Sequence, residues 1–316
     1  MIIAGGGVHY SEAWDELQGF SEAFGIPVGE TFAGKGAVRN DSALLLGGHG
    51  VTATPSATRI AAEADLVISV GTRLSDFTTG SQSAFKNPDV KFVGINVSGH
   101  DAYKQGALPL VADAREALRE LIKVAQDTGV EPRSAYLRDV ADAKSGWDTQ
   151  LEDEVYRPVP SEAMSQALLI QAINREARDG DTIVAAAGTP PGDLLKLWDA
   201  TGGRRCHLEF GYSCMGYELP AGLGVRMAQP AGEVYVFIGD GTYLMNPTEL
   251  VTAAQEGLKV TVIVSENHGF QSIHQLQMHR GGRNFATEFR GRDAGTGRLD
   301  GDYIGIDFAK NAEGFG

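Results

Sequence analysis

The chain has 316 residues, 42% of them hydrophobic, which is enough for about two globular domains with cores of their own. Its formal net charge of −14 argues against a nucleic-acid surface, because phosphate binding needs concentrated Lys and Arg. The two cysteines form no CxxC motif and no apolar run reaches the ~18 residues of a membrane span, so we expect a cytoplasmic protein without structural disulfides or a membrane partner.

Residues 1–125 alternate buried strands with amphipathic helices, the pattern of a parallel α/β sheet. A helix is expected over 113–125, where Leu118, Leu121 and Ala125 lie on one stripe. The expected strands are 1–4, 26–29, 66–70 and 91–97. Because the first residues already read as a buried strand, we expect the chain to be a piece of a longer polypeptide.

The stretch 129–159 has a different composition, charged and proline-containing, with one helix expected over 136–147. This composition is typical of an interdomain connection. We therefore expect a central α/β domain at 1–128, a connection at 129–159 and a second α/β domain at 160–316.

The second domain begins with a helix that Ser161 can cap and that carries Ile170 and Ile173 on one face. A glycine-rich segment, 211–225, leads into a helix of small residues. The expected strands are 182–187, 234–238 and 259–265, and residues 306–316 start a further helix.

Three of these strands end in residues that suit a ligand: Gly188-Thr189, Gly239-Asp240-Gly241 and Asn267-His268-Gly269. In open parallel sheets, ligands bind outside the carboxyl ends of the strands. Glycines on both sides of an aspartate let the backbone approach an anion while the carboxylate faces a cation. An isolated Gly-Asp-Gly can also be a simple tight turn.

The spacing favours a metal site over that simple turn. Asp240 and Asn267 lie 267 − 240 = 27 positions apart, and each follows an apolar strand. Between them Asn246 and Glu249 form an expected capping box, and Gly257 ends the helix. A carboxylate, an amide oxygen and a backbone carbonyl suit Mg²⁺, which leaves room for phosphate oxygens and so implies a diphosphate.

Gly-Asp-Gly, then residues 242–265, then Glu266-Asn267 resembles the signature of thiamine diphosphate-dependent enzymes. That signature usually ends in two asparagines, and Glu266 replaces the first of them. The resemblance implies that Mg²⁺ is held by Asp240, Asn267 and the carbonyl of Gly269, and that Gly239, Gly241 and Thr242 bind the cofactor's diphosphate.

The segment 211–224 is similar to the family's Gly-x-Met-Gly segment. The similarity implies that Met215 lies beneath the thiazolium and that the backbone around Ser213 bonds the aminopyrimidine. Gly188 and Thr189 match a second diphosphate-binding loop of the family. For Met215, packing in a core is the open alternative.

The resemblance covers the whole chain and implies two three-layer domains with parallel sheets. Residues 1–125 resemble the Rossmann-like central domain of the acetohydroxyacid synthase branch, and 160–316 resemble its diphosphate-binding domain. The family activates the cofactor with a glutamate from a separate N-terminal pyrimidine-binding domain, which this sequence lacks. We therefore assign no catalytic residue, and neither Glu30 nor Glu209 takes that role.

Within that branch, four stretches resemble hydrolases that open the ring of a cyclic dione in myo-inositol catabolism: 71–85, 95–114, 190–198 and 209–225. This implies hydrolytic C–C cleavage to a 5-deoxyglucuronate-type acid by a homodimer or homotetramer. The alternatives are an acetolactate synthase-type carboligase, and a cofactor-binding fragment that is inactive without its N-terminal domain.

The histidines have open roles. His268 lies in the expected metal loop and could move protons. His274 and His279 fit an exposed polar loop, and their five-residue spacing does not suit a zinc site. His49 lies in a segment that borders the substrate, or the flavin, in some relatives. Asn96 stands where a ribose-binding acid would be expected, so we predict neither FAD nor NAD.

Overall fold

A computed structural model describes residues 1–158 and 163–316, and contacts divide the chain into two units. The first unit comprises residues 1–176 with 192–204, and the second comprises 177–191 with 205–316. Each contains one parallel sheet with flanking helices, which confirms the predicted α/β class. The domain boundaries expected near 128 and 159 stay predictions, and the cap expected at Ser161 lies outside the described residues.

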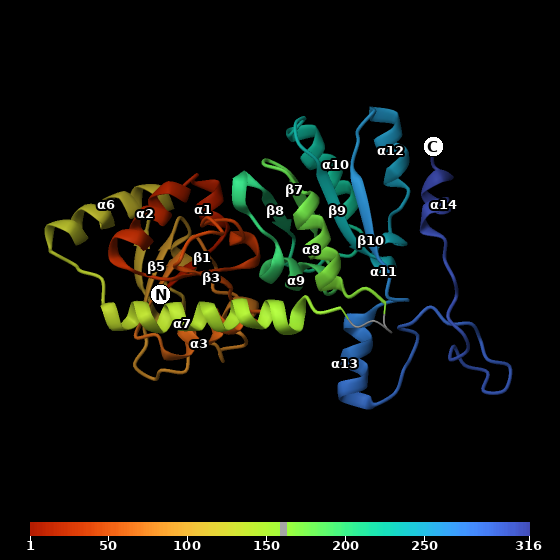
Figure 1. Cartoon of the computed structure of the whole chain (residues 1–316), viewed down its shortest axis with the longest axis horizontal. Coiled ribbons are helices and arrows are strands. Elements are labelled where there is room, and N and C mark those ends of the chain that lie inside the picture. The colour runs from red at the N-terminus through yellow and green to blue at the C-terminus, as the bar shows by residue number, and fades with distance from the viewer. Residues whose placement is uncertain (159–162) are drawn as a thin grey trace. The chain divides into compact units, whose positions relative to one another are not determined.

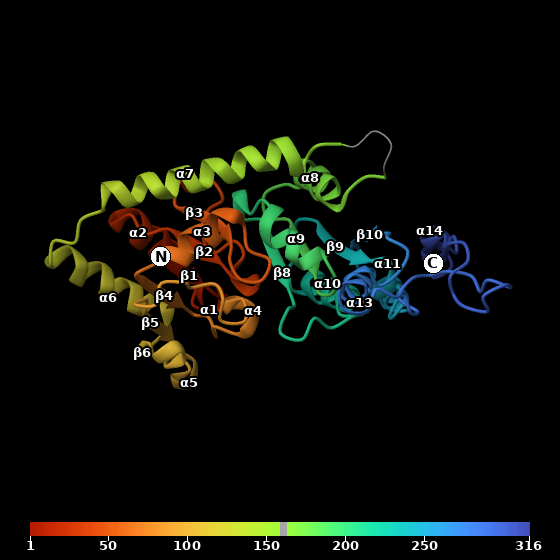
Figure 2. The same ribbon diagram turned by 90° about the horizontal axis from the view of Figure 1, so that it is seen from below.

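The first sheet has the strand order β3-β2-β1-β4-β5-β6, the doubly wound order of Rossmann-like domains (Figures 1 and 2, the second of which labels all six strands). All its strand pairs are parallel. The strands are β1 (Ile2–Ala4), β2 (Val28–Glu30), β3 (Leu45–Gly48), β4 (Leu66–Val70), β5 (Lys91–Asn96) and β6 (Leu108–Val111).

The first strand shows why this unit has three layers. Ile2 and Ala4 pack in one core with α2 (Trp14–Phe24) and α6 (Ala114–Asp127). Met1 and Ile3 pack in a second core with α3 (Pro55–Glu63) and α7 (Ser134–Gln150). Successive side chains of a strand point to opposite faces, so an unbroken apolar run indicates a strand covered on both faces.

The helix expected over 136–147 is confirmed as α7, which is longer at both ends. Its Val140 and Ala143 are buried, and it lies beside α3 in both views of the unit (Figures 1 and 2). The helix expected over 113–125 is α6, capped by the Asp113 carboxylate. The other helices of this unit are α1 (Gly6–Tyr10), α4 (Asp76–Thr79), α5 (Gly99–Ala102) and α8 (Gln166–Glu176).

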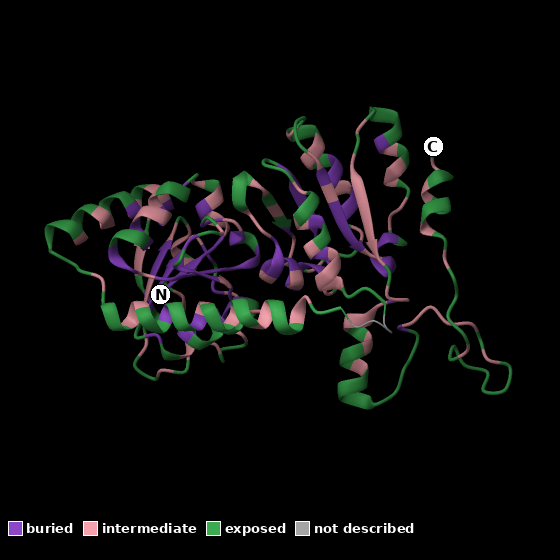
Figure 3. Ribbon diagram, viewed as in Figure 1, coloured by how far each residue is buried: buried purple, intermediate pink, exposed green. Residues whose placement is uncertain are grey.

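The second sheet has the order β10-β9-β7-β8 and is also parallel throughout. Its central strand β9 is largely buried, whereas the edge strand β10 is half-buried along its length (Figure 3). The strands are β7 (Thr182–Ala185), β8 (Arg205–Leu208), β9 (Val234–Gly239) and β10 (Thr261–Ser265). The helices are α9 (Pro190–Leu197), α10 (Glu218–Ala228), α11 (Asp240–Tyr243), α12 (Glu249–Glu256), α13 (Gln271–Gly281) and α14 (Phe308–Glu313). Of these, α9 begins in this unit, and its residues from Gly192 on belong to the first unit.

The capping box expected at Asn246 and Glu249 is wrong. A short helix, α11, precedes this segment, and α12 begins only at Glu249. The Asn246 side chain accepts a hydrogen bond from the Thr248 hydroxyl at 3.2 Å, so it is satisfied within the turn and caps no helix. The expected end is confirmed, because Gly257 adopts φ +61° after the last residue of α12.

The sequence prediction also missed one exposed helix and three edge strands. The polar loop expected around His274 and His279 is the helix α13, which buries none of its residues. The strands β3, β6 and β8 were not expected either, and each lies at the edge of its sheet. Among the described residues, none of the helices combines the length and the apolar character of a transmembrane segment.

Two glycines of α10 should respond in opposite ways to substitution by alanine. A Cβ at Gly222 would overlap the Val236 side chain of β9, whereas a Cβ at Gly224 would meet nothing within 4 Å. We expect Gly222→Ala to lower the free energy of unfolding by about 1–3 kcal/mol through overpacking. Gly224→Ala should raise it by about 0.5–1 kcal/mol, because alanine loses less backbone entropy. Urea unfolding followed by circular dichroism measures both; equal effects would contradict this packing of α10.

Candidate functional site

Every residue that the sequence analysis assigned to the cofactor lies at the carboxyl end of a strand of the second sheet. Since all four strands are parallel, the segments that follow them leave the same edge of the sheet. These segments are 186–189 after β7, 209–217 after β8, 239–242 at the end of β9 and 266–269 after β10.

Asp240 joins the ends of β9 and β10. The register pairs Gly239 with Ser265, so the residues that follow the two strands leave the sheet side by side. The Asp240 carboxylate is fully buried and accepts three main-chain hydrogen bonds. The Gly241 N–H donates to Oδ1 at 2.7 Å, and the N–H groups of Asn267 and Gly269 both donate to Oδ2 at 3.1 Å.

The side chain of Asn267 reaches the same point. One terminal atom of its amide lies 3.3 Å from Asp240 Oδ1 and 2.9 Å from the Gly269 carbonyl oxygen. The hydrogen bonds favour nitrogen at this place, since it can donate to both oxygens. A cation would favour the amide turned by 180°, with its oxygen at separations from these two oxygens close to the ~3 Å edge of an octahedron with ~2.1 Å metal–oxygen bonds. The residues present therefore fit a small hard cation.

The backbone of this loop depends on glycine. Gly269 has φ +140°, and a Cβ there would overlap the carbonyl oxygen of Thr287. A Cβ on Gly241 would lie 2.7 Å from the Phe270 ring. Larger residues at either position would displace the loop from Asp240.

The glycine-rich segment is hydrogen-bonded to the end of β9 and to the end of β7. The Gly216 N–H donates to Thr242 Oγ1 at 2.8 Å, and the Ser213 hydroxyl donates to the Ala186 carbonyl at 3.3 Å. Met215 is 41% exposed, which disfavours packing in a core. Gly188 is exposed with φ +79°, and Thr189 directly precedes α9.

Two glutamates support this segment, and the sequence prediction missed both roles. Glu209 accepts hydrogen bonds from the N–H groups of Tyr212, at 3.1 Å, and Cys214, at 2.9 Å. Burial acts to raise the pKa of Glu209, but these N–H donors outweigh it and keep the pKa below its usual value. Glu218 is buried and accepts from Thr242 Oγ1 at 3.0 Å, and burial raises its pKa. The signal in the sequence that could have indicated these roles is a carboxylate inside a run of small and apolar residues.

His268 is fixed by a chain segment that follows α13. Its ring stacks on Tyr303 with centroids 4.5 Å apart, and its Nδ1 lies 3.5 Å from Glu266 Oε1. The Arg290 guanidinium lies 3.7 Å from the centroid of the Tyr303 ring. The His268 carbonyl accepts from the Phe289 N–H at 2.8 Å, so main-chain bonds also hold this segment against the loop.

The remaining titratable residues that the sequence raised lie elsewhere. His49 is buried after β3, neither ring nitrogen has a hydrogen-bond partner in the described ranges, and burial lowers its pKa to about 4. Glu30 is buried in the first unit, 3.4 Å from Lys35 Nζ. His274 Nδ1 lies 3.2 Å from Thr287 Oγ1. Among the described residues no group of three or more His, Cys, Asp or Glu side chains suits a metal, so a cation would depend on the mixed oxygen set.

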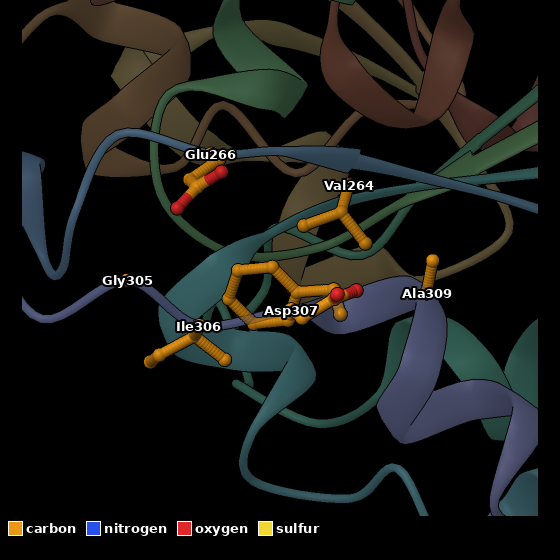
Figure 4. A pocket seen from close by; sticks show the side chains of 7 residues that line it. Val264, Glu266, Gly305, Ile306, Asp307 and Ala309 are labelled. Atoms are coloured by element: carbon orange, nitrogen blue, oxygen red, sulfur yellow. The ribbon is translucent and has the colours of Figure 1, made fainter.

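A cavity of about 550 Å³ lies along the outer edge of β10 (Figure 4). Val264 and Glu266 line one side of it, and residues 305–309 line the other. Its charged lining residues in the described chain are Glu266 and Asp307, both acidic, and Asp240 does not border it. Its charge therefore does not suit a diphosphate.

Comparisons with known proteins match both halves of the chain. The model described as thiamine pyrophosphate enzyme, central domain, matches residues 1–121, and the one described as thiamine pyrophosphate enzyme, C-terminal TPP binding domain, matches 186–316. Similar curated proteins include the 3D-(3,5/4)-trihydroxycyclohexane-1,2-dione hydrolases of Clostridium botulinum, 43% identical, and Bacillus cereus, 44% identical. The alignments cover 100% of this chain and 52% of each relative, so the chain spans about half their length.

Proposed function

Because the chain belongs to the thiamine pyrophosphate enzyme family, we propose that the intact protein is a thiamine diphosphate- and Mg²⁺-dependent hydrolase of 3D-(3,5/4)-trihydroxycyclohexane-1,2-dione. It would break a ring C–C bond with addition of water and release 5-deoxyglucuronate, a step of inositol catabolism. Identity of 43% along the whole chain to hydrolases of that name supports the substrate. The meeting of the Asp240 carboxylate, the Asn267 amide and the Gly269 carbonyl at one point carries the cofactor assignment.

The residues divide into groups by what they would hold. Asp240, Asn267 and the Gly269 carbonyl would bind Mg²⁺, with the buried carboxylate supplying the only full negative charge. Ser213 and Met215 would position the aminopyrimidine and the thiazolium. The diphosphate would be bound by Gly188, Thr189, Gly239, Gly241 and Thr242, which lie at the ends of β7 and β9.

When bound, thiamine diphosphate supplies an electron sink for the carbanion left when a C–C bond beside a carbonyl breaks. The described residues hold and orient this cofactor, and we assign none of them as its activating acid or base. We expect that group from a pyrimidine-binding domain, as the family resemblance implies, and expect the intact enzyme to be a homodimer or homotetramer. The chain has only two cysteines and no CxxC motif, which supports a reducing compartment, the cytoplasm.

The metal assignment predicts a large effect of Asp240→Asn, which keeps the shape of the side chain but removes its charge. We expect the affinity for thiamine diphosphate in saturating Mg²⁺ to fall by roughly 100-fold, since a charged contact of about 3 kcal/mol is lost. Isothermal titration calorimetry on the intact protein measures it. Glu256→Gln removes an exposed carboxylate at the end of α12 and is the matched control, with unchanged affinity. Unchanged binding by Asp240→Asn would refute the assignment.

The substrate assignment predicts that the intact protein, loaded with thiamine diphosphate and Mg²⁺, converts the cyclic dione to an open-chain acid. With pyruvate we expect a kcat/KM lower by a factor of about 1000 or more, because a site that hydrogen-bonds the hydroxyls of its substrate rejects molecules without them. Mass spectrometry of the products measures both reactions. Acetolactate as the main product would favour the carboligase instead.

A further inference from the structure

One buried carboxylate connects three segments at the ligand edge of the second sheet. Glu218, the first residue of α10, is 1% exposed. One of its carboxylate oxygens accepts a hydrogen bond from the Ala187 N–H at 3.0 Å, and the other accepts from the Thr242 hydroxyl at 3.0 Å. The Thr242 oxygen accepts in turn from the Gly216 N–H at 2.8 Å. Glu218 therefore links the chain that follows β7, β8 and β9.

The linked residues are neighbours of those that would hold the cofactor. Ala187 directly precedes Gly188, Gly216 directly follows Met215, and Thr242 lies two residues after Asp240. Movement of any one of these segments away from the others would break a hydrogen bond of this chain. Glu218 thus fixes the separation between the two loops that would face the diphosphate and the loop that carries Met215.

The helix dipole alone does not explain this glutamate. Acidic residues are common in the first turn of a helix, where they complement the dipole from a solvated position. Glu218 is instead buried, which disfavours its charged form and raises its pKa, and it forms no ion pair with Lys, Arg or His in the described chain. A buried carboxyl group is costly unless its oxygens are hydrogen-bonded, and here both oxygens bind donors of other segments.

We propose that Glu218 is a positioning residue that holds Thr242 and Gly216 together, so that the segments carrying Asp240 and Met215 present a preformed site to thiamine diphosphate. This rests on the proposed function. The Thr242 hydroxyl is the link, because it donates to Glu218 and accepts from Gly216. An amide cannot substitute fully, since glutamine offers one acceptor oxygen where the two donors need two.

The first test is Glu218→Gln in the intact protein, with thiamine diphosphate in saturating Mg²⁺ as the probe. We expect the Kd of the cofactor to rise about tenfold, the cost of one lost hydrogen bond in a buried site. We expect kcat at saturating cofactor to fall while the KM for the dione changes less than threefold. A Kd within twofold of the wild-type value would overturn the proposal.

The second test asks whether Glu218 acts through Thr242. Thr242→Val removes the hydroxyl at nearly constant volume, and a double-mutant cycle combines it with Glu218→Gln. The double variant should raise Kd by clearly less than the product of the two single effects. Glu209→Gln is the matched control, since Glu209 accepts from the N–H groups of Tyr212 and Cys214 in the same segment and has no hydrogen bond to Thr242 in the described chain. When Glu209→Gln is combined with Thr242→Val, the Kd of the cofactor should rise by the product of the two single effects.

The two proposals can fail separately. If the wild-type protein shows no Mg²⁺-dependent cofactor binding, both are overturned; if it binds and Glu218→Gln binds equally well, only the positioning role is. Should Glu218→Gln not fold, Thr242→Val and Thr242→Ser decide. Serine keeps the hydroxyl and should recover most of the affinity that valine loses, and equal loss in both variants would overturn the proposal.

Discussion

The buried carboxylate of Asp240 accepts hydrogen bonds from three main-chain N–H groups, and the arrangement of the site depends on this contact. Two of the donors, Asn267 and Gly269, belong to the segment that follows the neighbouring strand β10. The carboxylate thereby sets the path of that loop and brings the Asn267 amide and the Gly269 carbonyl to one point. Glycine at 269 is needed because only it adopts this backbone conformation without a clash.

The charge of this edge is consistent with the proposed divalent cation. The chain has a net charge of −14, and Asp240, Glu209, Glu218 and Glu266 all lie in the segments that leave the second sheet. A diphosphate would be repelled by these carboxyl groups. A cation between Asp240 and the diphosphate would remove that repulsion. Main-chain N–H groups and a metal ion can then bind an anion on an acidic protein.

The sequence predicted the strands of apolar composition well, and the strands of mixed composition and the exposed helix α13 poorly. Central strands such as β4 and β9 are predominantly apolar, because helices or neighbouring chain cover their faces. The edge strands β3, β6 and β8 mix glycine, proline or charged residues with apolar ones, and α13 buries no side chain, so periodicity gave no signal. The cap predicted at Asn246 was wrong because its side-chain oxygen accepts a hydrogen bond from the Thr248 hydroxyl inside a turn.

For the site, spacing and strand ends were enough to pair Asp240 with Asn267, since both follow apolar strands that the structure shows to be neighbours. The supporting contacts were beyond such reasoning. Glu218 and Thr242 are 24 positions apart and meet only because α10 packs against β9. Tyr303 reaches His268 from 35 positions away through an irregular segment without a repeating pattern. Contacts of this kind depend on tertiary structure, which one sequence does not reveal.

The central claim is that Asp240, Asn267 and Gly269 together form one cation site. Crystals of the intact protein grown with thiamine diphosphate and Mn²⁺ in place of Mg²⁺ test it directly, because the anomalous signal of manganese locates the ion. We expect one peak at roughly 2.1–2.2 Å from Asp240 Oδ1, Asn267 Oδ1 and the Gly269 carbonyl oxygen. A manganese peak elsewhere, with the Asn267 amide nitrogen still donating to Asp240, would contradict it.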